Sequence, residues 1–207
     1  IMNLCIDVQQ EFPIVRYIRN TKGRSITIAR NLGIEEAICD IILFLDDDVI
    51  LDRDYVKEIS IVFGHWTGGV TGNILTNKKE PSWLSNIYCK LFFLSRFDNI
   101  SLSGANMAFR KEILDEFKFD ENLEGYAFME DLDIAYRISR KYHNLVIPSA
   151  KLIHNQSVVA RRANKHEVQN MKYLFKKNFP QTIKNKIAFQ WMLIGYSLRK
   201  LYILETN

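Results

Sequence analysis

Apolar residues follow two different spacings along the chain, and the changes between them outline alternating helices and strands. Residues 25–37 place apolar side chains on one side at intervals of three to four, which predicts a helix. Five consecutive apolar residues follow at 41–45, and such a run is typical of a strand buried on both faces of a parallel sheet that helices cover. A second helix is predicted over 54–63.

Shorter elements continue this pattern through the second half of the chain. A glycine-rich turn enters a short strand over 68–74, and the aromatic stretch 83–97 is interpreted as a helix lying over the sheet. Further helices are predicted to begin near Lys111 and at Glu130. Two short strands, 145–148 and 151–154, complete the pattern, and Pro148 is expected to end the first of them.

Three consecutive aspartates, Asp46, Asp47 and Asp48, stand directly after the apolar run at 41–45. The carboxyl ends of strands are where α/β sheets bind ligands. Three adjacent negative charges repel one another unless a cation, hydrogen-bond donors or water offset them, and oxygen ligands suit Mg²⁺ or Mn²⁺. The alternative is a solvated acidic turn before a helix. Both interpretations stay open on this motif alone.

A second group of small and polar residues, Gly104, Ala105 and Asn106, precedes the helix near Lys111. The small residues would let backbone N–H groups approach a ligand closely, and the Asn106 amide suits sugar hydroxyls. The alternative is a connection in which glycine serves geometry alone. His154 ends an apolar run and is either a ligand or a structural hydrogen-bonding residue.

Glu130 and Asp131 open the predicted helix at 130, where the helix dipole stabilises carboxylates and is a sufficient structural reason for them. If this helix start faces the three aspartates, one carboxylate could instead accept a proton from an attacking hydroxyl. Arg137 is expected either to reach a phosphate or to pair with Asp133 at the i, i+4 spacing.

Composition sets broad limits on the class of protein. A chain of 207 residues that is 47% hydrophobic can build one sizeable core, so we expect one domain with a tail. Its three cysteines are widely separated, which indicates neither a disulfide framework nor a zinc cluster and fits a reducing, cytoplasmic setting. No signal-peptide pattern opens the chain.

Charge is distributed unevenly, although the formal net charge is a modest +4. Residues 151–200 hold eleven Lys or Arg and a single acid, Glu167. Such a segment favours phosphate or anionic lipid, and no recognisable nucleic-acid-binding module is present. Residues 187–204 mix apolar positions with Trp191, Tyr196 and Tyr202, which predicts an amphipathic helix at a membrane surface. The alternative is a helix packed on the domain.

Five segments in order resemble family 2 glycosyltransferases of the GT-A fold: the 25–31 segment with Arg30, the aspartates after 41–45, the 104–110 segment, Glu130 to Asp133 with Arg137, and His154. The resemblance implies an α/β, Rossmann-like three-layer sandwich with a mostly parallel central sheet and a helical C-terminal tail. It places a glycosyltransferase domain at 1–155 and a basic, aromatic extension at 156–207.

The resemblance also implies a role for each of these residues. Asp46 and Asp48 match the DXD motif that holds Mn²⁺ or Mg²⁺ on a nucleotide-diphosphate sugar, and His154 resembles a further metal or diphosphate contact. Asp131 matches the catalytic base of inverting enzymes, and Glu130 would orient the acceptor. The residues expected to contact the donor are Arg30, Asp46, Asp47, Gly104, Ala105, Asn106 and Arg137.

The implied activity is inverting transfer of a sugar to a carbohydrate or lipid-linked acceptor, in bacterial surface polysaccharide or glycoconjugate synthesis. The expected location is the cytoplasm, at the inner face of the cytoplasmic membrane, with peripheral membrane contact through the tail and no nucleic acid as partner. The chain departs from the family's pattern at its start, where residues 1–20 resemble the linker that follows the first strand–helix–strand unit. Because half a nucleotide pocket would then be missing, a binding-only remnant stays an alternative, as does a metal-dependent sugar nucleotidyltransferase.

Overall fold

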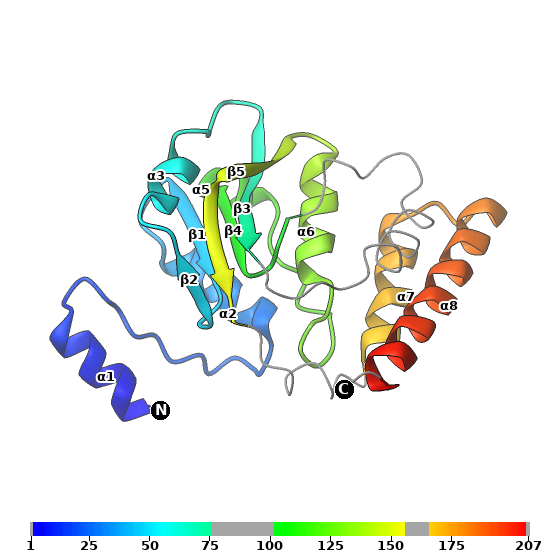
Figure 1. Cartoon of the computed structure of the whole chain (residues 1–207), viewed down its shortest axis with the longest axis horizontal. Helices are drawn as coiled ribbons and strands as arrows, with labels where there is room; N and C mark the ends of the chain where they lie inside the picture. Colours follow the sequence, from blue (N-terminus) through cyan, green and yellow to red (C-terminus); the bar gives the residue numbers. More distant parts are fainter. Residues whose placement is uncertain (1, 76–101, 156–165, 206–207) are drawn as a thin grey trace.

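The computed structural model of the chain describes residues 2–75, 102–155 and 166–205, and these form one mixed sheet with helices on both faces (Figure 1). The strands are β1 (Ile41–Leu45), β2 (Val49–Leu51), β3 (Thr67–Leu75), β4 (Asn106–Arg110) and β5 (His143–His154). The helices are α1 (Met2–Glu11), α2 (Ile26–Glu36), α3 (Tyr55–Ser60), α5 (Lys111–Glu116), α6 (Glu130–Ser139), α7 (Glu167–Asn178) and α8 (Ile183–Glu205).

The strands pair in the order β1-β4-β3-β5-β2. Strands β3 and β5 are parallel, whereas β4 is antiparallel to both β1 and β3, and β2 is antiparallel to β5. The predicted mostly parallel sheet is therefore wrong in this detail, because an apolar run reports burial and carries no information about strand direction. Strands β1, β3 and β5 still point the same way, so their carboxyl ends lie at one edge of the sheet.

The sheet separates two apolar clusters, and the side chains of β4 show how. Met107 and Phe109 point into the cluster built with α2, α5 and α6, whereas Ala108 points to the opposite face, where Tyr55 of α3 packs. This alternation is the two-residue period of a strand. The layered α/β architecture expected from the sequence is confirmed, with helices covering both faces.

Three residues connect β1 at one edge of the described sheet to β2 at the other. The four steps from Leu45 to Val49 span at most about 14 Å, whereas four strand spacings in a flat sheet would need about 19 Å. The sheet must therefore curl, so that both edges approach each other at the end where the three aspartates lie.

Several predicted elements differ from the observed ones. Strand β5 continues through Pro148, because its register to β3 jumps from Ile147 to Lys151 and the intervening residues bulge out of the ladder. Helix α3 is shorter than the predicted 54–63, and the stretch expected to be a linker contains α1. The four residues 41–44 of β1 are only partly buried, and the predicted helix at 83–97 lies outside the described residues.

Helices α7 and α8 form the C-terminal end of the described chain and lie side by side beyond α6 (Figure 1). Their shared core contains Met171 and Phe175 of α7 with Phe189 and Met192 of α8. The rings of Phe175 and Phe189 are stacked with centroids 4.3 Å apart. Among the helices that the structure describes, none has the combination of length and apolar character needed to cross a bilayer.

Candidate active site

The carboxyl ends of β1 and β5 bring Asp46, Asp48 and His154 together. One ligand atom from each of these three side chains lies within 4.8 Å of the others. His154 Nε2 is 2.9 Å from Asp48 Oδ1 and 3.9 Å from Asp46 Oδ2. Residues 106 positions apart in the sequence therefore meet because β5 ends beside β2, where His154 pairs with Val49 directly after the aspartates.

The chemistry of these three side chains fits a divalent cation. Asp48 Oδ1 is buried and faces His154 Nε2 at 2.9 Å, with no hydrogen bond from any other described residue. A buried carboxylate oxygen with so few donors is costly. Burial raises the pKa of the Asp46 carboxyl, and the neighbouring Asp48 and Asp47 charges add to this, although Arg30 and His154 oppose it. A bound cation would offset both costs, and the two oxygens with one imidazole suit Mn²⁺.

Arg30 of α2 is buried beside this cluster and connects it to the start of α6. Its Nη1 donates to Glu130 Oε1 at 2.6 Å, and its Nη2 donates to the Gly104 carbonyl at 2.9 Å. The same Nη2 is 3.9 Å from Asp46 Oδ1. The guanidinium also lies beside the paired rings of Phe44 and Phe119, at 5.9 and 5.3 Å from their centroids. Arg30 is thus held rigidly as the positive centre of an acidic site.

Glu130 and Asp131 begin α6, as predicted, and both face the loop that contains Gly104. The Gly104 N–H donates to Asp131 Oδ2 at 3.0 Å, and Oδ1 accepts from the Leu132 N–H at 2.8 Å. Burial raises the pKa of Asp131, against the effect of these two hydrogen bonds. Burial and the Asp131 charge together raise the pKa of Glu130 to about 7, although Arg30 opposes the shift.

Gly104 has a steric reason to be glycine. A Cβ at this position would lie 3.2 Å from Glu130 Oε1 and 3.3 Å from Asp131 Oδ2. The backbone of residue 104 therefore contacts both carboxylates and Arg30 at once. The backbone at Gly104 thus approaches other residues of the chain closely, and the predicted approach to a ligand stays a prediction.

Tyr126 is a neighbour of the site that the sequence did not single out. Burial of its hydroxyl raises its pKa, and so do the Asp46 and Glu130 carboxylates, although the side chain as a whole is 65% exposed. It lies in a loop where Gly125, Ala127 and Met129 all have positive φ, of 64°, 57° and 73°. Such backbone is strained for the two non-glycine residues, and Gly125 next to an aromatic residue was the available sequence signal.

Four predicted donor contacts are placed elsewhere or differently. Asn106 is fully buried, and its Oδ1 accepts from Tyr55 Oη, Thr71 Oγ1 and the Gly72 N–H inside the sheet. Ala105 offers its carbonyl to the Asp46 N–H at 3.2 Å, and Asp47 is exposed outside the metal-ligand cluster. Arg137 pairs with Asp133 at 2.9 Å, which is the structural alternative that the spacing left open.

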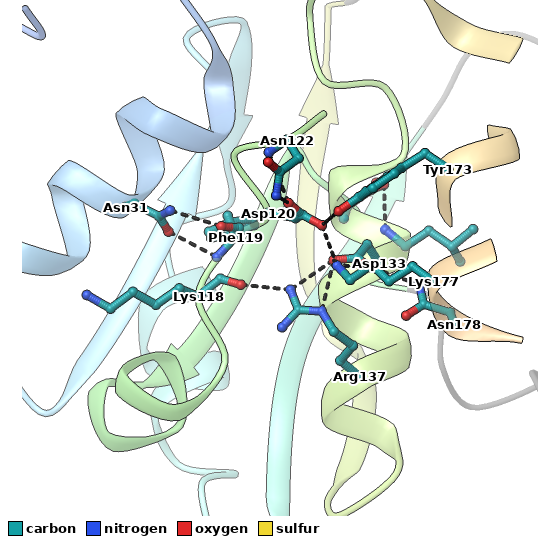
Figure 2. Close-up of polar contacts among 12 residues, drawn as sticks. Asn31, Lys118, Phe119, Asp120, Asn122, Asp133, Arg137, Tyr173, Lys177 and Asn178 are labelled. Carbon is teal, nitrogen blue, oxygen red and sulfur yellow. Dashed lines mark hydrogen bonds and ion pairs between the residues drawn. The ribbon is translucent and has the colours of Figure 1, made fainter. Parts of the chain in front are cut away.

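Asp133 belongs to a polar network that ties α6 to α7 (Figure 2). It is 2% exposed, and it pairs with Arg137 on its own helix and with Lys177 of α7 at 3.0 Å. Lys177 also contacts Asp120 at 2.5 Å. Burial raises the pKa of Asp120, but hydrogen bonds from Lys177, Asn122 and Tyr173 outweigh it and lower the pKa to about 2. The network therefore fixes α7 against the helix that carries Asp131.

Three solved glycosyltransferases share this fold with the chain at low sequence identity. GalNAc-T7, solved with UDP, GalNAc and Mn²⁺, has a TM-score of 0.58 at 13% identity, over 84% of this chain and 39% of its own. The mannosyltransferase PcManGT from Pyrobaculum calidifontis, with GDP-Man and Mn²⁺, has a TM-score of 0.57 at 15% identity, over 96% of this chain and 62% of its own. Glucosyl-3-phosphoglycerate synthase from Mycobacterium tuberculosis, with Mn²⁺, UDP and phosphoglyceric acid, has a TM-score of 0.51 at 14% identity, over 80% of this chain and 57% of its own.

The chain thus spans less than two thirds of the length of each of these structures. No protein of curated function matches it in sequence. The likeness confirms the expected GT-A fold. The profile of "Glycosyl transferase family 2" matches residues 3–117, more than half of the chain. The chain therefore belongs to glycosyl transferase family 2.

Proposed function

We propose that this chain is a metal-dependent, inverting glycosyltransferase that takes its sugar from a nucleotide-diphosphate donor. The observation that carries the proposal is the meeting of two acidic clusters across Arg30. Asp46, Asp48 and His154 form one cluster, and Glu130 and Asp131 form the other. Inverting transfer needs positive charge for the leaving diphosphate and a base for the acceptor at neighbouring positions.

In this proposal Asp46, Asp48 and His154 hold Mn²⁺ or Mg²⁺. When bound, such a cation supplies positive charge that offsets the charge developing on a departing nucleotide diphosphate. The proposal also has indirect support from the fold, since structures that share it were solved with Mn²⁺ and UDP or with Mn²⁺ and GDP-Man. Asp47 is left out of the proposed ligands because it is exposed outside the cluster. Arg137 and Asn106 are left out because their observed contacts lie elsewhere.

Asp131 is the proposed base. The hydrogen bonds from Gly104 and Leu132 fix both carboxylate oxygens, so the group is oriented before an acceptor arrives. Its raised pKa, which results from burial, makes it a stronger proton acceptor than an exposed aspartate. In the proposed step an acceptor hydroxyl transfers its proton to Asp131 while its oxygen attacks the anomeric carbon, and the bond from that carbon to the diphosphate breaks.

Glu130 and Tyr126 complete the acceptor side in this proposal. Glu130 is paired with Arg30, and protonation near pH 7 would let it donate as well as accept a hydrogen bond. Tyr126 presents a mostly exposed side chain within electrostatic reach of Asp46 and Glu130. We infer that Tyr126 contacts a bound sugar, because an aromatic ring with a hydroxyl suits a carbohydrate ring and its hydroxyls.

For the biological role we propose transfer to a carbohydrate or lipid-linked acceptor in bacterial surface polysaccharide or glycoconjugate synthesis, on the cytoplasmic side of the membrane. Residues 1–155 would supply the chemistry, and 156–207 would form a separate extension. Support for the extension comes from its ten Lys or Arg against two acids and from the apolar core that α7 and α8 share.

The Asp131→Asn substitution tests the proposed mechanism. Asparagine keeps the shape and can still accept a hydrogen bond, so donor binding should stay while transfer falls by about a hundredfold or more. Donor binding is measured by titration calorimetry and transfer by release of nucleoside diphosphate. The configuration of the product at its anomeric carbon, read by NMR, tests inversion. Retained transfer in the variant would remove Asp131 from the role of base, and release of pyrophosphate would favour a nucleotidyltransferase.

A further inference from the structure

Helix α8 carries a row of exposed apolar side chains on its outer surface. Five residues make up this row, here called the outer stripe: Ile183, Ile187, Trp191, Ile194 and Leu198. Each of them is between 50% and 78% exposed. Their spacing of four, four, three and four residues keeps them on one side of a helix with 3.6 residues per turn.

The opposite side of α8 is already occupied by packing within the chain. Phe189 and Met192 are buried against α7, and Leu193 and Tyr196 pack around the same cluster. Tyr196, which the sequence placed at a membrane surface, therefore turns inward and lies 6.2 Å from the ring of Phe128. Because the inner side suffices to dock α8 on the chain, the outer stripe needs a separate explanation.

The charge around the outer stripe indicates the kind of surface it fits. Between Glu167 and Glu205 the sequence contains no acid and seven cations: Lys172, Lys176, Lys177, Lys184, Lys186, Arg199 and Lys200. Lys184 and Lys186 are exposed in the first turn of α8, next to the stripe. Lys177 is paired with Asp120 and Asp133, so the cations that matter for this surface are the exposed ones beside the stripe. Apolar residues beside exposed cations are the arrangement of a helix that lies in the interface of an anionic bilayer.

We propose that the outer stripe of α8 docks on an anionic membrane surface, with the isoleucines, Leu198 and Trp191 entering the headgroup boundary and the flanking lysines pairing with lipid phosphates. A second copy of the chain is a poorer partner, because a face-to-face contact would bring lysines against lysines in a stretch that has no acid between Glu167 and Glu205. The docking needs neither nucleotide nor metal, so it goes beyond the proposed transfer reaction and does not depend on it.

Vesicle sedimentation with the full chain tests this surface. The probes are vesicles of phosphatidylcholine alone and vesicles of phosphatidylcholine with an equal amount of phosphatidylglycerol. We expect binding to the mixed vesicles that weakens at high salt and is much weaker on phosphatidylcholine alone. The double variant Ile187→Ser/Ile194→Ser should lower the partition coefficient by about tenfold or more, since each isoleucine adds buried apolar area.

The matched control is Ile38→Ser/Ile61→Ser, which removes two isoleucines of 89% and 68% exposure that lie outside α8 and should leave vesicle binding unchanged. A second variant, Lys184→Glu/Lys186→Glu, should weaken binding to the mixed vesicles alone. Equal loss in the control pair, no binding to either vesicle, or unchanged binding of the stripe variant would overturn the proposal. The proposal would also be overturned if the wild type formed a dimer without lipid and the Ile187→Ser/Ile194→Ser variant were monomeric. Nucleotide binding, measured on the same samples, reports separately on the transfer site.

Discussion

Gly104 and Arg30 show how single residues set the geometry of this site. Arg30 contacts Glu130 and the Gly104 carbonyl while it lies 3.9 Å from Asp46, so one guanidinium serves both acidic clusters. Gly104 brings its backbone against the same carboxylates because it has no side chain. The two residues are 74 positions apart in sequence, yet together they fix the distance between the proposed metal ligands and the proposed base.

Gly104→Ala should therefore lower transfer more than it lowers donor affinity. The added Cβ would meet Glu130 and Asp131 at 3.2 and 3.3 Å, so both carboxylates must shift by a few tenths of an ångström. We expect kcat to fall by about tenfold to a hundredfold. The control is Gly33→Ala in α2, where a Cβ meets nothing within 4 Å and should stabilise the helix by about 0.5–1 kcal/mol. Equal kcat in both variants would contradict the steric argument.

Glu130 should make the stability of the protein depend on pH. Its pKa is raised in the folded state from 4.5 to about 7, so the folded chain keeps this proton where the unfolded chain loses it. The free energy of unfolding should accordingly decrease as pH rises from about 4.5 to about 7, by on the order of 2 kcal/mol.

Glu130→Gln removes this ionisation while keeping an oxygen that can accept from Arg30. Urea unfolding at a series of pH values should show a smaller decrease for the variant than for the wild type, with the difference developing below pH 7 and constant above it. Parallel curves for the two proteins would show that burial does not shift the pKa of Glu130 in this way.

Helix α6 connects the proposed active site to the C-terminal helices. Its first turn carries Glu130 and Asp131, and Asp133 in the same turn accepts from Lys177 and Asn178 of α7. A buried carboxylate requires such partners. Contacts from α7 therefore hold the first turn of α6 in place at Asp133, two residues after the proposed base.

Lys177→Met should destabilise the protein by about 1–3 kcal/mol, because it leaves the buried Asp133 with fewer donors and removes the Lys177 contact to Asp120. Chemical unfolding measures this change. Lys176→Met is the matched control, since Lys176 is an exposed neighbour on the same helix and should change stability by no more than about 0.5 kcal/mol. Similar losses in both variants would mean that the network in Figure 2 contributes little.

Local pattern was enough to locate most elements, because periodicity and helix-start chemistry act within a few residues. It correctly placed α2, β1 and the start of α6, and the i, i+4 spacing anticipated the Arg137–Asp133 pair. It failed where distant segments decide the outcome. The bulge lets β5 continue through Pro148, and β4 inserts between β1 and β3 in the opposite direction.

At the scale of the whole molecule, the site exists because the ends of the sheet strands converge. The aspartate motif was visible in the sequence, but the approach of His154 to Asp48 depends on the pairing of β2 with β5 across the curled sheet. Likewise, the chemistry of Asn106 was predicted for a sugar, whereas its buried amide oxygen stabilises the sheet interior. Spacing alone did not assign roles to the carboxylates. The resemblance to family 2 glycosyltransferases did so, with Asp46 and Asp48 as metal ligands and Asp131 as the base.

The most direct test is calorimetric titration of UDP and of GDP into the chain, with and without Mn²⁺, in the wild type and two aspartate variants. We predict nucleotide binding that requires Mn²⁺ and that Asp48→Ala abolishes. In Asp47→Ala the binding should keep its metal dependence, because Asp48 lies in the cluster with Asp46 and His154 whereas Asp47 is exposed outside it. Binding that is independent of Mn²⁺, or that is the same in Asp48→Ala as in the wild type, would contradict the proposed metal-dependent site.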